Sequence, residues 1–113
     1  MANLLDLHCK RPNAGEALTE SEIVEYAEQV PDWKVLERDG IPQLEREFRF
    51  KNFAQALAFT VQIGILAEKE DHHPAVTTEW GKVKVVYWTH VVKTLHLNDF
   101  ISAARADKIF SGD

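Results

Sequence analysis

A long apolar helix that must end at Asp71-His72-His73-Pro74 constrains this chain more than any other feature. The helix is predicted over residues 52–70, where apolar residues recur at helical spacing. Pro74 cannot continue a helix, and it forces extended backbone at His73. Two adjacent histidines therefore leave the helix end in different directions, and the rest of the chain reads as a scaffold for them.

The other segments predict four strands and two more helices. Alternating apolar residues and turn signals favour strands over residues 33–37, 44–50, 76–80 and 82–92. A capping box formed by Thr19 and Glu22 begins a short helix, and a last helix begins near residues 96–98. We expect an α+β fold in which three helices pack on one face of a four-stranded antiparallel sheet. This single domain spans residues 19–113 and follows an irregular lead over residues 1–18.

The helix over residues 52–70 carries two apolar stripes, although one sheet covers only about one stripe of a helix. The first stripe consists of Phe53, Leu57, Val61 and Ile65, and the second of Phe59, Ile63 and Leu66. The surplus stripe predicts a contact between subunits, and the alternative is a deep groove within one domain.

Composition narrows the functional classes. A net charge of −5 argues against general nucleic-acid binding, which needs a basic surface. The single cysteine, Cys9, excludes an internal disulfide and a cysteine-rich zinc site. Because the sequence shows neither a membrane span nor a secretory signal pattern, we expect a cytoplasmic protein that does not enter a membrane.

Three histidines are the candidates for chemistry. His72 and His73 lie at the helix end and His90 lies on a predicted strand, and imidazole exchanges protons near neutral pH. The plainer alternative is that one histidine caps the last carbonyls of the helix. A metal site is a further alternative, but adjacent histidines do not share a helix face as the usual zinc pairs do.

Carboxylates and an aromatic residue accompany these histidines. Glu68 and His72 are four residues apart, so Glu68 is predicted to orient that ring, although charged runs such as this one commonly form only a solvated face. Asp99 falls in a first helical turn, where an acid is stabilising by itself. Trp33 suits a core position or the wall of a pocket for a planar ligand, and His96 is predicted to cap or border the last helix.

The spacing of these residues resembles the signature of the pterin-4a-carbinolamine dehydratases. Asp71-His72-His73-Pro74 is followed after five residues by Trp80, after nine more by His90 and after eight more by Asp99. The resemblance extends over about residues 19–110, because similar segments occur at Pro31-Asp32-Trp33, Asn52-Phe53 and Asn98-Asp99-Phe100.

This resemblance implies a function. Members of the family dehydrate 4a-hydroxytetrahydrobiopterin to quinonoid dihydropterin without a metal or cofactor, which recycles the pterin used by phenylalanine hydroxylase. They form homodimers or homotetramers on the fold described above. The resemblance assigns catalysis to His72, His73 and His90, and substrate contacts to Glu68, Asp71, Asp99 and Trp33. One of His72 and His90 is expected to protonate the leaving hydroxyl, and which ring is acid and which is base stays open.

The same resemblance implies an alternative of another class. In some animals the family also acts as a dimerisation cofactor, or transcriptional coactivator, that stabilises a transcription-factor dimer. The surplus apolar stripe of the helix over residues 52–70 would then bind a protein partner.

Overall fold

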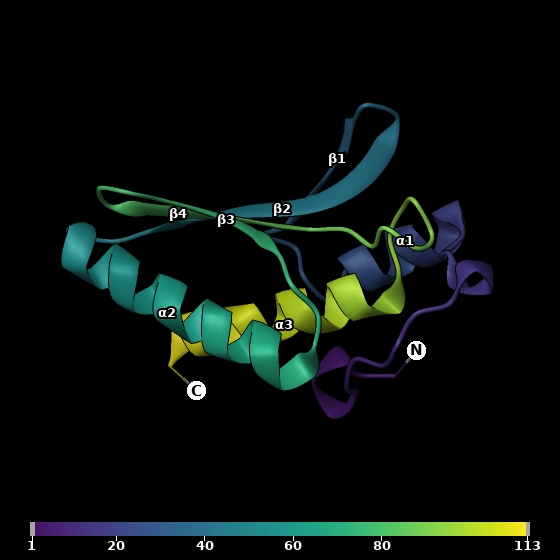
Figure 1. Ribbon diagram of the computed structural model, residues 1–113, viewed down its shortest axis with the longest axis horizontal. Coiled ribbons are helices and arrows are strands. Elements are labelled where there is room, and N and C mark those ends of the chain that lie inside the picture. Colours follow the sequence, from purple (N-terminus) through teal and green to yellow (C-terminus); the bar gives the residue numbers. More distant parts are fainter. Residues whose placement is uncertain (1, 113) are drawn as a thin grey trace.

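The computed structural model describes residues 2–112 and shows a sheet with helices beneath one face (Figure 1). The strand order is β1-β2-β4-β3, and each neighbouring pair is antiparallel. This arrangement confirms the predicted α+β fold. In chain order the elements are two 3-10 turns, η1 (Leu4–Asp6) and η2 (Ala14–Glu16), then α1 (Glu20–Ala27), β1 (Lys34–Arg38), β2 (Ile41–Arg49), α2 (Phe53–Glu70), β3 (Ala75–Glu79), β4 (Lys82–Tyr87) and α3 (Leu97–Ser111).

The boundaries follow local chemistry that the sequence displays. Thr19 and Glu22 form the predicted capping box at the start of α1. The turn between β1 and β2 places both Asp39 and Gly40 at positive φ, as the Asp-Gly pair predicts. Asn52 caps α2, which runs to Glu70 as expected.

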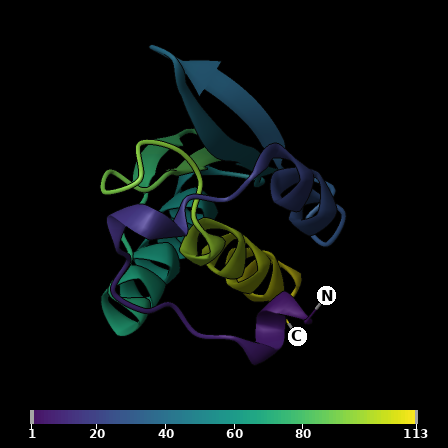
Figure 2. The same ribbon diagram turned by 90° about the vertical axis from the view of Figure 1, so that its right-hand side faces the viewer.

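The core lies between the sheet and the helices α2 and α3 (Figures 1 and 2). Leu44, Phe48 and Tyr87 contribute from the sheet, and α2 buries its Phe59, Ile63 and Leu66 stripe against them. The other stripe of α2 is left 45–62% exposed within the single chain; we call Phe53, Leu57, Val61 and Ile65 the outer stripe. None of the helices within residues 2–112 is long and apolar enough to cross a membrane.

The strand predicted over residues 82–92 is shorter in the structure, because β4 ends at Tyr87. Beyond it the chain reverses tightly: Thr89 pairs with Thr94, and Lys93 adopts a left-handed conformation while its N–H donates to the carbonyl of His90. Branched and aromatic residues favour a strand locally, but here the chain must turn back to reach α3, and tertiary context overrides that preference.

The segment over residues 2–18 is fixed to the domain. Leu4 is fully buried in the core, and Figure 2 shows the segment crossing α3 towards the end of α2. The side chain of Asn98 pairs with both backbone groups of Lys10, at 3.1 Å and 2.7 Å. We call residues 2–18 the N-terminal segment.

Candidate active site

Four elements end or begin at the same end of the sheet. The helix α2 finishes just before Asp71, β3 begins at Ala75, β4 ends at Tyr87 and α3 begins after His96. Ala75 is paired with Val86, and this register carries residues 73–74 alongside residues 87–88. The fold therefore gathers residues 71–73, 88–90 and 96–99, which are distant in the sequence.

A buried pair of His72 and Asp99 forms the centre of this cluster. The Nε2 atom of His72 lies 2.6 Å from Oδ1 of Asp99, a short distance that is typical of a charge-assisted hydrogen bond. The carboxylate of Asp99 is fully buried and the histidine is 8% exposed. The ring of His72 is nearly parallel to that of Tyr87, at an interplanar angle of 10°. The imidazole is thus held on one edge and one face.

Asp99 is itself fixed by two further hydrogen bonds. Its Oδ2 atom accepts from the Thr89 hydroxyl at 2.8 Å and from the backbone N–H of His96 at 2.9 Å. The second bond belongs to the capping box of α3, in which His96 is the N-cap residue as predicted. A negative charge in the first turn of a helix is also favoured by the helix dipole. One carboxylate therefore both caps α3 and orients His72.

This geometry defines which atom of His72 is available for chemistry. With Asp99 ionised, Nε2 carries a proton and donates it to the carboxylate, which leaves Nδ1 of the neutral ring as a base. When Nδ1 takes up a proton, the resulting cation is stabilised by the adjacent anion. A histidine held in this way can both accept and return a proton at Nδ1.

His73 pairs with Glu68 on the outside of the cluster. Its Nε2 atom lies 2.5 Å from Oε2 of Glu68, and both side chains are exposed. The prediction that Glu68 orients His72 is wrong, since that carboxylate contacts His73 and Asp99 holds His72. The reason is the backbone: Asp71 takes a left-handed conformation at φ 50°, so the helical spacing no longer applies beyond Glu70.

His90 lies in the tight reversal after β4, next to Thr89. It is exposed, and its ring packs against the indole of Trp88 with 3.8 Å between centroids. The cluster thus offers one buried and two exposed imidazoles, with an aromatic surface beside them. Side chains of this kind can bind a planar molecule and exchange protons with it.

Three other residues singled out from the sequence lie elsewhere or are less engaged. Trp33 is 5% exposed, sits in the core against Phe48 and Tyr87, and donates from Nε1 to Asp107 at 2.8 Å. Trp80 is exposed at the β3–β4 turn, at the opposite end of the sheet from the histidines. Asp71 is exposed at the end of α2. The role of Trp33 as a pocket wall and that of Asp71 as a substrate ligand stay predictions.

Sequence reasoning missed Thr89 and Tyr87. Nothing in their spacing signals a role, because Tyr87 meets His72 and Thr89 meets Asp99 only once distant segments have folded together. Burial raises the pKa of the Tyr87 phenol, with smaller contributions from Cys9 and Asp99, so this ring packs as a neutral group. Among residues 2–112 no three His, Cys, Asp or Glu side chains converge in a way that would hold a metal ion.

Comparisons with known proteins agree with this arrangement. A family model described as pterin 4 alpha carbinolamine dehydratase matches residues 16–109. A crystal structure of a transcriptional coactivator/pterin dehydratase from Brucella melitensis is 33% identical, with a TM-score of 0.76, over 82% of this chain and 97% of that chain. A pterin dehydratase-like protein identified as a RuBisCO assembly factor in the alpha-carboxysome is 23% identical, with a TM-score of 0.59, over 73% of this chain and 92% of that chain. That second likeness extends to the fold alone.

Proposed function

This chain belongs to the pterin 4 alpha carbinolamine dehydratase family, and from that premise we propose that it catalyses the dehydration itself. The substrate would be 4a-hydroxytetrahydrobiopterin or a related 4a-hydroxytetrahydropterin, and the products quinonoid dihydropterin and water. Family membership alone does not establish an activity, because one fold supports several functions. The observation that carries the proposal is the buried hydrogen bond between His72 and Asp99, which orients an imidazole for proton transfer.

The reaction needs two proton transfers. The C–O bond of the carbinolamine breaks while the lone pair of the neighbouring ring nitrogen forms a C=N bond. The departing oxygen takes a proton from an acid and leaves as water, and the nitrogen gives its proton to a base. Histidines suit both tasks near neutral pH, and such acid–base catalysis contributes about 10²–10⁴-fold.

We assign these transfers to His72 and His90, with His73 as a substrate contact. His72 has Nδ1 free for exchange and Asp99 to stabilise its cation. His90 comes from a different segment and is exposed, so it can approach another side of the same molecule. Glu68 would hold His73 in place through their short contact.

The test compares three histidine-to-alanine variants by stopped-flow absorbance with freshly made 4a-hydroxytetrahydropterin. His72→Ala and His90→Ala should each lower the enzyme-dependent rate by about 10²-fold, the lower limit expected for a lost acid or base. His8→Ala is the matched control, because His8 is exposed and lies outside the cluster. Full activity in both site variants, with folding unchanged by circular dichroism, would refute the assignment.

We further propose that the chain forms a homodimer or homotetramer through the outer stripe of α2. Four large apolar side chains that are 45–62% exposed on one helix form a surface that soluble monomers rarely leave uncovered. Val61→Glu should reduce the mass measured by light scattering after size exclusion. Val24→Glu is the control, since Val24 is 65% exposed, compared with 55% for Val61, but lies on α1. An unchanged mass in Val61→Glu would exclude the stripe as the subunit contact.

The outer stripe also supports the second candidate function, a protein-binding cofactor of transcription. A heterologous partner would then compete for the same side chains. A partner captured by the wild type, lost with Leu57→Glu and retained with His72→Ala would favour this function over catalysis. For the dehydratase we propose the cytoplasm as the compartment and the recycling of the pterin used by phenylalanine hydroxylase as the setting.

A further inference from the structure

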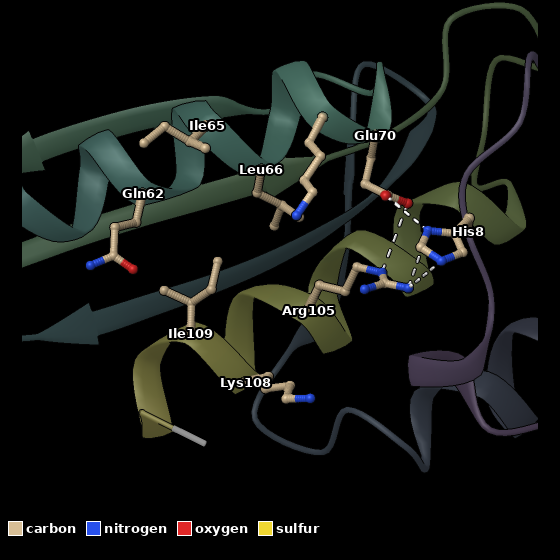
Figure 3. Close-up of a pocket in the computed structure, with 9 residues that line it drawn as sticks. His8, Gln62, Ile65, Leu66, Glu70, Arg105, Lys108 and Ile109 are labelled. Carbon is tan, nitrogen blue, oxygen red and sulfur yellow. Dashed lines mark hydrogen bonds and ion pairs between the residues drawn. The ribbon is translucent and has the colours of Figure 1, made fainter.

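A groove between α2 and α3 lies outside the histidine cluster. It encloses about 500 Å³, which is within the range of about 300–1,000 Å³ found for small-molecule sites. Figure 3 shows its two walls: Ile65 and Leu66 project from α2, and Ile109 projects from the facing side of α3. The walls of the groove are therefore mainly apolar, with Gln62 of α2 as a polar exception.

The rim of this groove is cationic on a chain that is acidic overall. Lys69, Arg105 and Lys108 line it together with one carboxylate, that of Glu70, whereas the whole chain has a net charge of −5. Neither lysine forms an ion pair within 4 Å of a carboxylate among residues 2–112. Both lysines therefore line the groove without an ion-pair partner among the described residues.

The carboxylate of Glu70 does not neutralise these lysines, because it is already engaged. Its side chain is 7% exposed; it accepts from the backbone N–H of Cys9 at 2.9 Å, contacts Nδ1 of His8 at 3.0 Å and lies 3.8 Å from Nε of Arg105. Burial acts to raise the pKa of Glu70, but these donors outweigh it and the pKa lies below its ordinary value. Glu70 is therefore an ionised anchor for the N-terminal segment.

Arg105 connects this anchor to the groove. Its Nη2 atom donates to the carbonyl of Leu7 at 2.6 Å, while its buried Nε has no hydrogen-bond partner among the described residues. Figure 3 shows dashed lines from the guanidinium towards Glu70 and His8, with one nitrogen free of them. A guanidinium has five N–H donors, and the two on Nη1 form no hydrogen bond with the described residues, so they are left for an anion.

The dimensions and lining of the groove indicate what kind of ligand it can hold. His8, from the N-terminal segment, lies at the Glu70 end of the groove (Figure 3). A volume of about 500 Å³ is that of a small-molecule site. We propose that this groove binds a small amphipathic anion, with its apolar body between Leu66 and Ile109 and its carboxylate or phosphate against Lys69, Arg105 and Lys108.

The test uses 4-phenylbutyrate as the probe and its neutral amide, 4-phenylbutyramide, as the matched compound. Both are titrated into the full-length, ¹⁵N-labelled protein and followed by two-dimensional amide spectra. The carboxylate should shift signals on both walls, including Arg105 and Ile109 of α3. The amide should bind about fivefold more weakly, because two unit charges about 4 Å apart in water attract each other by about 1 kcal/mol.

Charge variants complete the experiment. Lys69→Gln and Lys108→Gln should each lower the affinity for 4-phenylbutyrate by about fivefold, because each removes one unit charge from the rim. Lys51→Gln should leave binding unchanged, since Lys51 precedes α2 at its far end. Equal binding of acid and amide, or affinities unaffected by both rim substitutions, would overturn the proposal. Shifts confined to the outer stripe, which shares only Ile65 with the groove, would overturn it as well.

Discussion

Replacement of Asp99 by Asn should slow dehydration while leaving the fold in place. Asn has nearly the same shape as Asp, so it can still accept the Thr89 and His96 hydrogen bonds that cap α3. It cannot offer an anion to Nε2 of His72, which now lies 2.6 Å from a carboxylate oxygen. The substitution therefore removes the charge that stabilises a protonated His72 and holds its ring.

The size of the effect follows from that one bond. Hydrogen bonds to charged groups contribute about 1.5–3 kcal/mol, and each 1.36 kcal/mol on a barrier changes the rate about tenfold. If the transition state carries the proton on His72, the rate should fall by about 10- to 150-fold. The loss of charge from the first turn of α3 should also destabilise the fold by about 0.3–1 kcal/mol.

Stopped-flow absorbance with 4a-hydroxytetrahydropterin measures the rate, and urea unfolding measures the stability. The control is Asp107→Asn, which makes the same chemical change eight residues further along α3, about 12 Å away. Asp107 pairs with Arg46 and Trp33 instead of a histidine, so its loss should affect stability more than rate. An unchanged rate in Asp99→Asn, or an equal loss of rate in Asp107→Asn, would refute the role given to this carboxylate.

Three further predictions concern the N-terminal segment. Leu4→Ala should lower the free energy of unfolding in urea by about 2–5 kcal/mol, because Leu4 is fully buried; a loss below about 0.5 kcal/mol would contradict the contact. Burial raises the pKa of the Cys9 thiol from 9.0 to about 11. Because only the thiolate reacts, iodoacetamide at pH 8 should alkylate the native protein about 100-fold more slowly than the urea-unfolded chain. Mass spectrometry can follow both reactions. The pKa of Glu70 is lowered on folding, so its charge stabilises the protein above the ordinary pKa and that stability is lost as pH falls through the lowered value. Glu70→Gln should therefore be less stable than the wild type at pH 7, and in urea titrations this difference should shrink as the pH falls below the ordinary carboxyl pKa.

Much of the fold could be predicted because its signals are local. The capping box at Thr19, the turn at Asp39-Gly40 and the Asn52 cap each specify a boundary through a few neighbouring residues, and the structure has all three. The alternation that predicts a strand over residues 44–50 also corresponds to the burial of Leu44 and Phe48 in the core. Local chemistry of this kind can be read without knowledge of the rest of the chain.

The errors arose where distant segments decide the outcome. The end of β4 at Tyr87 depends on the reversal that brings the chain to α3, which no residue near Val92 announces. Likewise, the burial of Leu4 depends on α3, which lies about a hundred residues later in the chain. A sequence read in short windows has no access to such contacts.

The candidate site also combines features that follow from local sequence with features that depend on distant contacts. The histidines at the helix end and Asp99 stood out, but their pairing did not, because a helical interpretation linked Glu68 to His72 across a residue that is in fact left-handed. Asp99 was harder to interpret, since a first-turn acid is explained by capping alone. In the structure it both caps α3 and holds His72, so the two explanations are compatible. Since a single carboxylate does both, the start of α3 cannot shift without moving the imidazole, and the position of the helix becomes part of the geometry of the site.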